Sequence, residues 1–143
     1  MILALTGTRY GMTLQQQQQV TSILQRLQPD SVVHGGCRGA DTDFHGLVLS
    51  YQPQMPITIY PGDATQAAAP WPGLCDVRPV KPYLRRNKDI VNTADTILAT
   101  PRGFREELRS GTWATIRFAE KVGKPIFIIY PDGTVTSLLS FKS

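Results

Sequence analysis

The sequence predicts an α/β fold: a single Rossmann-like domain with a five-stranded, mainly parallel sheet and helices on both faces. Short apolar runs alternate with longer segments whose apolar residues recur every three or four positions, as expected for alternating strands and helices. Three strands run directly into glycine-containing turns. The 143 residues, 41% of them hydrophobic, suffice for one core and hardly for two, so 1–143 is expected to be one domain.

The first predicted unit is an apolar strand over 2–6, a glycine-bounded turn over 7–11, and a helix. Thr13 is a suitable N-cap, and Pro29 ends the helix. The glutamine run over 15–19 is interpreted as its solvated side. The face expected to be buried carries Val20, Ile23, Leu24 and Leu27.

The second unit follows the same order, with a strand at Val32 and Val33, a turn containing Gly35, Gly36 and Gly39, and a helix. Glycines there allow a ligand to approach the backbone, and the helix start presents unpaired N–H groups. An anion is the simplest occupant, although the same pattern also occurs in turns that bind nothing. The apolar positions of the helix are Ala40, Phe44, Leu47, Val48 and Tyr51.

A third strand is expected over 57–60, followed by a long irregular insertion over 61–82. Five prolines punctuate this insertion, and neither a helical nor a strand period is present. Because such loops are uncommon inside a domain unless they cover a site or meet another subunit, we interpret 61–82 as a lid or a dimer contact. Trp71 is its expected anchor, and a disordered insertion is the alternative.

Pro82 opens the next predicted helix, and Asn87 lies on its apolar face. A buried amide needs a hydrogen-bond partner, which either a backbone group or a ligand supplies. Arg86, at the flank of that face, is the basic residue most readily aimed at a phosphate. The remaining residues of the face are Tyr83, Ile90, Val91 and Ala94.

The last two strands are predicted over 96–100 and 126–130. Between them lie a loop over 101–110 and a helix that begins at Gly111 and Thr112 and ends before Gly123. Asp132 and Gly133 form a turn, and the tail to Ser143 is expected to be a short edge strand or an irregular end.

The three glycine turns, at Gly7, at Gly35 and Gly36, and at Gly111, all follow carboxyl ends of strands. Ligands bind beyond these ends in doubly wound sheets, so the turns predict one shared pocket. Neither a GxGxxG fingerprint nor a Walker motif is present. The net charge of +4 and the nine basic against four acidic residues over 78–117 favour an anionic ligand.

Other classes of protein are disfavoured by the sequence. No apolar run approaches the roughly 20 residues of a membrane span, and no signal peptide is evident, so we expect a cytoplasmic protein without a membrane partner. Cys37 and Cys75 are isolated, which fits a reducing compartment. A divalent metal site at His34, Cys37, Asp41 and His45 and a nucleophilic Cys37 are weaker alternatives; no metal and no cofactor are expected.

An ordered set of motifs resembles the SLOG superfamily, which includes DprA, the LOG phosphoribohydrolases and small bacterial and phage proteins of the YpsA and YspA type. The resemblance covers roughly 1–130 and is closest to the small members. The motifs are Thr6-Gly7-Thr8-Arg9, His34-Gly35-Gly36-Cys37-Arg38-Gly39-Ala40-Asp41, Arg86-Asn87 and Gly111-Thr112.

The resemblance implies a nucleotide or nucleotide-derived ligand across the glycine turns. The LOG enzymes carry Pro-Gly-Gly-x-Gly-Thr-x-x-Glu, whereas here an insertion follows Pro101-Arg102-Gly103 and Thr115 stands at the position of the catalytic glutamate. Whether the chain is an enzyme is therefore open. The carboxylates that might replace the glutamate are Asp41, Asp43, Glu106 and Glu107, and capping of a helix is the alternative role of Asp41. The expected ligand contacts are Gly7, Thr8, Arg9, Gly35, Gly36, Arg38, Asp41, Arg86, Asn87, Gly111 and Thr112.

Three functions follow as hypotheses. The first is binding of a nucleotide-derived small molecule by a sensor, carrier or sequestering protein. The second is a nucleotide N-glycosidase whose catalytic carboxylate is displaced. The third, suggested by the kinship with DprA, is binding of single-stranded DNA. A homodimer or larger homo-oligomer is expected by analogy with small relatives.

Overall fold

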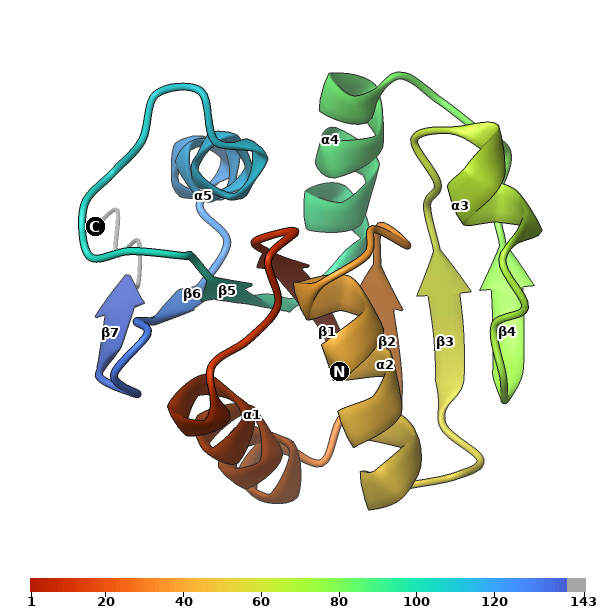
Figure 1. Cartoon of the computed structure of the whole chain (residues 1–143), viewed down its shortest axis with the longest axis horizontal. Coiled ribbons are helices and arrows are strands. Elements are labelled where there is room, and N and C mark those ends of the chain that lie inside the picture. Colours follow the sequence, from red (N-terminus) through yellow and green to blue (C-terminus); the bar gives the residue numbers. More distant parts are fainter. Residues whose placement is uncertain (139–143) are drawn as a thin grey trace.

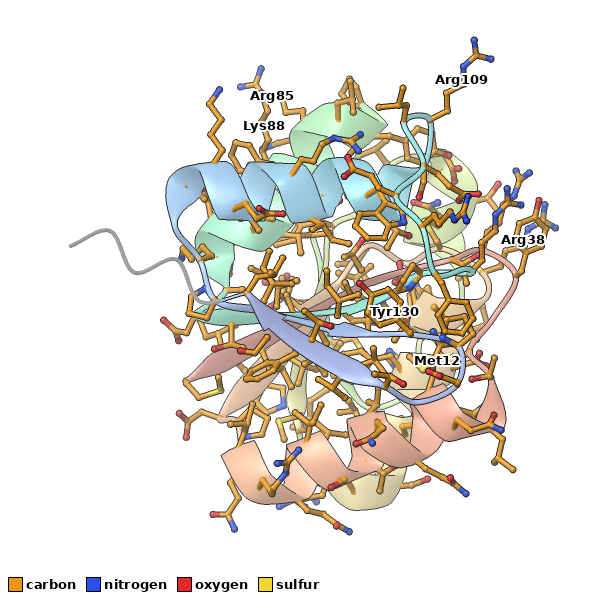
Figure 2. The ribbon with its side chains drawn as sticks, turned by 90° about the vertical axis from the view of Figure 1, so that its left-hand side faces the viewer. Met12, Arg38, Arg85, Lys88, Arg109 and Tyr130 are labelled. Atoms are coloured by element: carbon orange, nitrogen blue, oxygen red, sulfur yellow. The ribbon has the colours of Figure 1, made fainter. Side chains whose placement is uncertain are left out.

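A computed structural model describes residues 1–138 as a seven-stranded sheet between two helical layers (Figures 1 and 2). The strands lie in the order β4-β3-β2-β1-β5-β6-β7. The elements are β1 (Ile2–Gly7), α1 (Leu14–Leu27), β2 (Ser31–His34), α2 (Ala40–Tyr51), β3 (Pro56–Ile59), α3 (Ala64–Ala68), β4 (Leu74–Val77), α4 (Tyr83–Thr93), β5 (Thr96–Thr100), α5 (Gly111–Val122), β6 (Ile126–Ile129) and β7 (Val135–Leu138).

The sheet is wound in two directions from its centre. From β1 the chain steps outward to β2, β3 and β4, and it then returns to the other side of β1 to form β5, β6 and β7. Every neighbouring pair is parallel except β6 and β7. The winding therefore reverses between β1 and β5. The predicted Rossmann-like class is confirmed, but the predicted number of five strands is wrong.

The two additional strands are the two edges of the sheet. In β4, Leu74 and Val77 flank a polar residue and are exposed, so no apolar run marks the strand. In β7, one antiparallel partner suffices to hold a short mixed segment in place. The expectation of an edge strand in the tail is met over 135–138, whereas 139–143 lie outside the described residues.

The segment 61–82 is not irregular throughout, contrary to the prediction. It contains α3, whose start is capped by the Asp63 side chain, and the strand β4. Trp71 packs against the core as expected of an anchor, and its ring nitrogen donates to the Gln66 carbonyl at 2.9 Å. Five residues of helix are too few to show a period, which explains why the pattern missed α3.

Two apolar clusters hold the layers together, one on each face of the sheet. Leu3 and Leu5 point toward α1 and α2, while Ala4 between them points toward α4 and α5. This alternation is the two-residue period of a strand buried on both faces. Within residues 1–138, no helix has the length and apolar character needed to cross a membrane.

The N-terminal cap of α1 is as predicted, but one glutamine behind it is not solvated. Thr13 and Gln16 form a reciprocal capping box. Gln16 is 1% exposed, and its amide nitrogen donates to the carbonyls of Pro101 and Ile129, both at 2.9 Å. The interpretation of 15–19 as entirely solvated is therefore wrong for this residue, which ties α1 to the ends of β5 and β6.

A buried histidine pair connects β2 to α2. The Gly36 amide donates to His34 Nδ1 at 2.9 Å, which makes Nδ1 an acceptor and places the proton of a neutral ring on Nε2. That nitrogen donates to His45 Nδ1 at 2.9 Å, and His45 Nε2 donates to the Pro72 carbonyl at 2.8 Å. Both rings are thus neutral, and the chain of bonds holds the segment before β4 against α2.

We expect acid to destabilise the fold through this pair. Burial lowers the pKa of His34 from 6.5 to about 3, so between these values the unfolded chain binds a proton that the folded chain does not. The free energy of unfolding should fall by up to about 1.4 kcal/mol per pH unit from this group as the pH drops below its unfolded pKa. Urea unfolding at several pH values between about 7 and 5 measures this slope.

The control is His34→Asn, which keeps an acceptor for the Gly36 amide but does not titrate. Asp41, whose pKa is raised to about 6, contributes a slope of opposite sign, and His45, whose pKa burial lowers, contributes one of the same sign. Both groups are present in the two proteins, so the difference between the two slopes reports the loss of His34. Identical slopes in the two proteins would contradict the assignment.

Candidate functional site

A cleft of about 730 Å³ lies over the carboxyl ends of β1, β2 and β5. It therefore opens where the winding of the sheet reverses, the position at which doubly wound folds bind ligands. The lining residues come from four places: Leu5, Thr6, Gly7, Thr8, Arg9 and Tyr10; Gly35, Cys37 and Asp41; Tyr83, Arg86, Asn87 and Ile90; and Arg102, Glu107, Leu108, Arg109, Ser110, Gly111 and Thr112.

The structure brings most of the predicted contact residues to this cleft. Nine of the eleven line it: Gly7, Thr8, Arg9, Gly35, Asp41, Arg86, Asn87, Gly111 and Thr112. Gly36 does not, because it is buried beside Ile59 and Trp71, and Arg38 extends outward as an exposed side chain (Figure 2). That the nine bind a ligand stays a prediction.

The floor of the cleft is set by Gly7 at the end of β1. A Cβ atom there would lie 2.2 Å from Thr100 Oγ1 and 2.4 Å from the Ala40 Cβ. The Thr8 amide donates to the Thr100 carbonyl, and the Ala40 amide donates to the Thr8 carbonyl. Glycine is thus required by close packing of two strands and a helix start.

Arg86 acts as a buried support behind the second glycine turn. It is 4% exposed, and its Nη1 donates to the carbonyls of Gly35 and Tyr60. Its Nε donates to Asn87 Oδ1 at 2.9 Å, which provides the partner that the Asn87 amide was expected to need. The buried face of α4 differs from the predicted one. Arg86, expected at the flank of that face, is buried, whereas Tyr83, expected on the face, is 49% exposed. At most one N–H, on Nη2, is left for the predicted phosphate contact, because Nη2 also donates to Cys37 Sγ.

Asp41 is the buried carboxylate of the cleft. It is 5% exposed and accepts a hydrogen bond from the Cys37 amide at 3.0 Å. Burial raises its pKa from 3.8 to about 6, although this bond and Arg86 act in the opposite direction. Asp43, the other candidate, does not line the cleft and accepts from the Met12 amide at 2.8 Å. Of this pair, only Asp41 lines the cleft.

The metal and nucleophile alternatives find no geometric support. His34 and His45 are bonded to each other, and within residues 1–138 no three His, Cys, Asp or Glu side chains are arranged to hold a metal ion. Burial raises the pKa of the Cys37 thiol above 9.0 rather than lowering it, which disfavours a thiolate nucleophile.

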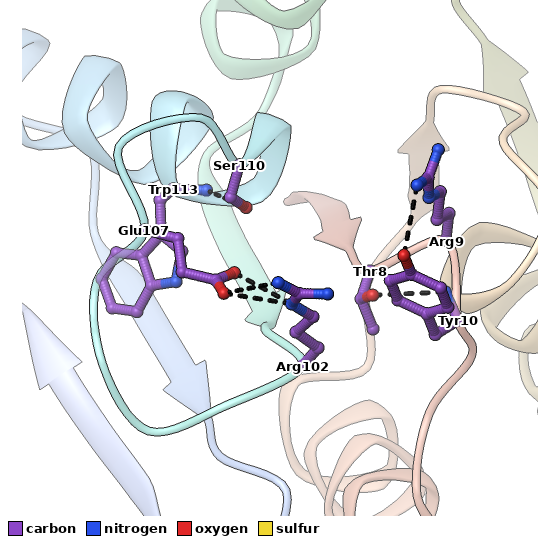
Figure 3. A network of polar contacts seen from close by, with 7 residues as sticks. All are labelled: Thr8, Arg9, Tyr10, Arg102, Glu107, Ser110 and Trp113. Carbon is purple, nitrogen blue, oxygen red and sulfur yellow. Dashed lines mark hydrogen bonds and ion pairs between the residues drawn. The ribbon is translucent and has the colours of Figure 1, made fainter.

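A polar cluster at the mouth of the cleft joins the first glycine turn to the loop 101–110 (Figure 3). The guanidinium carbons of Arg9 and Arg102 lie 5.2 Å and 5.5 Å from the centre of the Tyr10 ring. The hydrogen bond from Arg9 lowers the pKa of Tyr10. Glu107 binds Arg102 through both carboxylate oxygens, at 2.8 Å and 3.2 Å. Two cations and an aromatic ring thus surround the opening, with one carboxylate among them.

The start of α5 also faces the cleft. Ser110 caps it by accepting from the Trp113 amide, and among residues 1–138 the amides of Gly111 and Thr112 have no hydrogen-bond partner. Thr115, at the position of the LOG glutamate, is 1% exposed and donates to the Gly111 carbonyl. Its hydroxyl does not line the cleft.

Sequence reasoning missed Tyr10 and the bidentate contact between Arg102 and Glu107. A signal existed for Tyr10, which lies between Gly7 and Gly11 in the first glycine turn. For the ion pair, a spacing of five residues in a loop gives no geometric prediction, because no helical or strand period fixes where the side chains point.

A scan of known protein families and a search of curated proteins find no match to the chain. Among solved structures, it is similar to TM1055, a target of the Northeast Structural Genomics Consortium, with a TM-score of 0.64 and 18% identity over 87% of this chain and 71% of that one. It is also similar to DNA processing protein A (DprA) from Streptococcus pneumoniae, with a TM-score of 0.65 and 19% identity over 88% of this chain and 49% of that one. The chain thus spans about half the length of DprA.

At these identities the likeness concerns the fold. Both similarities support the Rossmann-like architecture that the sequence predicts.

We expect Gly7→Ala to lower the free energy of unfolding by about 1–3 kcal/mol, because the added methyl group collides with Thr100 and Ala40. The matched control is Gly46→Ala within α2, where a Cβ meets nothing within 4 Å. That substitution should stabilise the helix by about 0.5–1 kcal/mol. Urea titrations of both variants test the contrast, and equal effects at the two glycines would refute the packing argument.

Proposed function

We propose that the cleft binds a nucleotide or a nucleotide-derived small molecule. The main support is that Arg9, Arg102 and the N-terminus of α5, with backbone amides unbonded within residues 1–138, all line one cavity. That cavity lies where the winding of the sheet reverses. Guanidinium groups and helix N-termini both stabilise phosphate oxygens. The volume of the cleft, about 730 Å³, is within the usual range for small-molecule sites.

The other lining residues suit the remaining parts of such a ligand. Tyr10 and Tyr83 are 65% and 49% exposed at the rim, where an aromatic ring offers a surface on which a base can stack. Asp41 is positioned to accept hydrogen bonds from sugar hydroxyl groups when ionised. A phosphate near Arg102 has to compete with Glu107, which already occupies that guanidinium.

We expect Arg102→Ala to weaken nucleotide binding by at least about tenfold, since a charge-assisted hydrogen bond contributes roughly 1.5–3 kcal/mol. Calorimetric titration with nucleoside 5′-monophosphates and diphosphates, each beside its unphosphorylated nucleoside, measures the effect. Arg105→Ala is the matched control, because Arg105 is exposed in the same loop and does not line the cleft. No binding of any phosphorylated compound, or equal losses in both variants, would argue against the site.

Glu107→Gln should have the opposite effect and tighten binding several-fold, because the carboxylate that competes for Arg102 is removed. Glu106→Gln changes the net charge equally but frees Arg117, which does not line the cleft. A similar gain in both variants would show that only overall charge matters.

A second candidate function is hydrolysis of a nucleotide N-glycosidic bond, favoured by the burial and pKa of Asp41. A carboxyl group with a pKa of about 6 exchanges a proton near neutral pH, as a general acid or base must. Incubation with nucleoside 5′-monophosphates and chromatography for the free base tests this function. Base release should vanish in Asp41→Asn and persist in Asp43→Asn, whereas no release by the unmodified protein would leave binding alone.

A further inference from the structure

Many of the exposed large apolar side chains lie in the edge strand β4 and in the segment that follows it along the chain. Ten large apolar residues are exposed within 1–138, and five of them lie between positions 74 and 84. These are Leu74, Val77, Val80, Tyr83 and Leu84. Figure 1 shows β4 at one edge of the sheet, and no strand of residues 1–138 pairs with its outer side. Exposed edges of this kind are templates for pairing with another strand.

The hydrogen bonds to β3 show which backbone groups of β4 face outward. The Arg78 amide donates to the Ile59 carbonyl at 2.8 Å, and Ile59 is paired with Val77. Because successive residues of a strand direct their N–H and C=O groups to opposite sides, those of Val77 and Cys75 point away from the sheet. The outer edge thus offers two residues with both a donor and an acceptor.

We propose that a second copy of this chain pairs with β4 in the antiparallel direction, with Val77 on the two-fold axis. The two copies of Val77 then exchange both of their backbone hydrogen bonds, as directly opposed residues of an antiparallel pair do. The same register sets Asp76 opposite Arg78 of the second copy, twice per dimer. The Arg78 side chain is 50% exposed and the Asp76 side chain 65% exposed. Within one chain the two form an ion pair at 3.5 Å, and the contact across the axis extends this pair to the second copy.

Charge selects this axis over its neighbours. An axis through Asp76 sets two carboxylates opposite each other, and an axis through Arg78 does the same with two guanidinium groups; both arrangements are destabilising. An axis through Cys75 sets Asp76 opposite Leu74 and leaves Arg78 without a counter-charge. The axis through Val77 is therefore the self-complementary choice on this strand.

Pro79 limits the length of the hydrogen-bond ladder, and the two-fold symmetry limits the assembly to a dimer. Its position in the alternation would direct an N–H outward, but proline has none, so the ladder weakens two residues from the axis. A two-fold contact uses the same surface on both copies and closes on itself. None of residues 74–80 lines the cleft, so the contact leaves both clefts open.

The first test is a disulfide on the axis. In the Cys75→Ser background, Val77→Cys should form a covalent dimer under mild oxidation, since hydrogen-bonded antiparallel partners have Cα atoms about 5.5 Å apart and disulfides span about 4.4–6.8 Å. Val122→Cys, on the exposed surface of α5, is the control and should remain monomeric under the same oxidation.

The second test is a charge exchange read by native mass spectrometry and sedimentation over a series of protein concentrations. Asp76→Arg should raise the dissociation constant of the dimer by at least about tenfold, and the double variant Asp76→Arg with Arg78→Asp should restore it. A monomer at all concentrations, cross-linking through Val122 as readily as through Val77, or a dimer unaffected by Asp76→Arg would overturn the proposal.

Discussion

The structure depends on one close approach, at the point where β1 ends. Gly7 allows the Thr100 side chain and the start of α2 to meet at a distance that no other residue would permit. The backbone then follows a fixed course, because Thr8 is bonded to Thr100 on one side and to Ala40 on the other. This contact fixes where the turn that carries Arg9 and Tyr10 begins, and the contacts of these two residues with each other and with Arg102 then shape the mouth of the cleft.

The shape of the cleft wall depends on a buried arginine behind it. Gly35 packs directly against the Arg86 guanidinium, which a Cβ on residue 35 would meet at 2.4 Å. Arg86 also donates hydrogen bonds to the Tyr60 carbonyl and to Asn87 Oδ1, so it holds both residues near this turn. A buried cation thus shapes a surface that it scarcely reaches itself. Arg9 and Arg102, in the turns after β1 and β5, are accessible at the mouth instead, and the exposed Arg109 of the loop 101–110 also lines the cleft. The arginine that supports the fold and the arginines at the mouth of the cleft therefore differ in burial.

The sequence predicted the elements that a period or a cap defines, and it predicted where they converge. Gly7 and Gly35 lie at the ends of β1 and β2, and Gly111 begins the helix that follows β5; parallel winding alone brings these three positions to one edge of the sheet. What it did not predict depends on neighbours distant along the chain: β4 exists because β3 pairs with it, and Arg86 is buried because Gly35 and Tyr60 supply carbonyls. Gln16 was misjudged for the same reason, since its partners are more than eighty residues away.

That glutamine has a consequence for the loop 101–110. Its amide binds the carbonyl of Pro101, the first residue of the loop, from a helix on the opposite side of the sheet to α5. The root of the arginine-bearing loop is therefore anchored by a side chain that never meets the cleft. A graft of this loop onto another Rossmann-like scaffold would have to include an equivalent of Gln16, because the loop residues alone do not hold Pro101 in place.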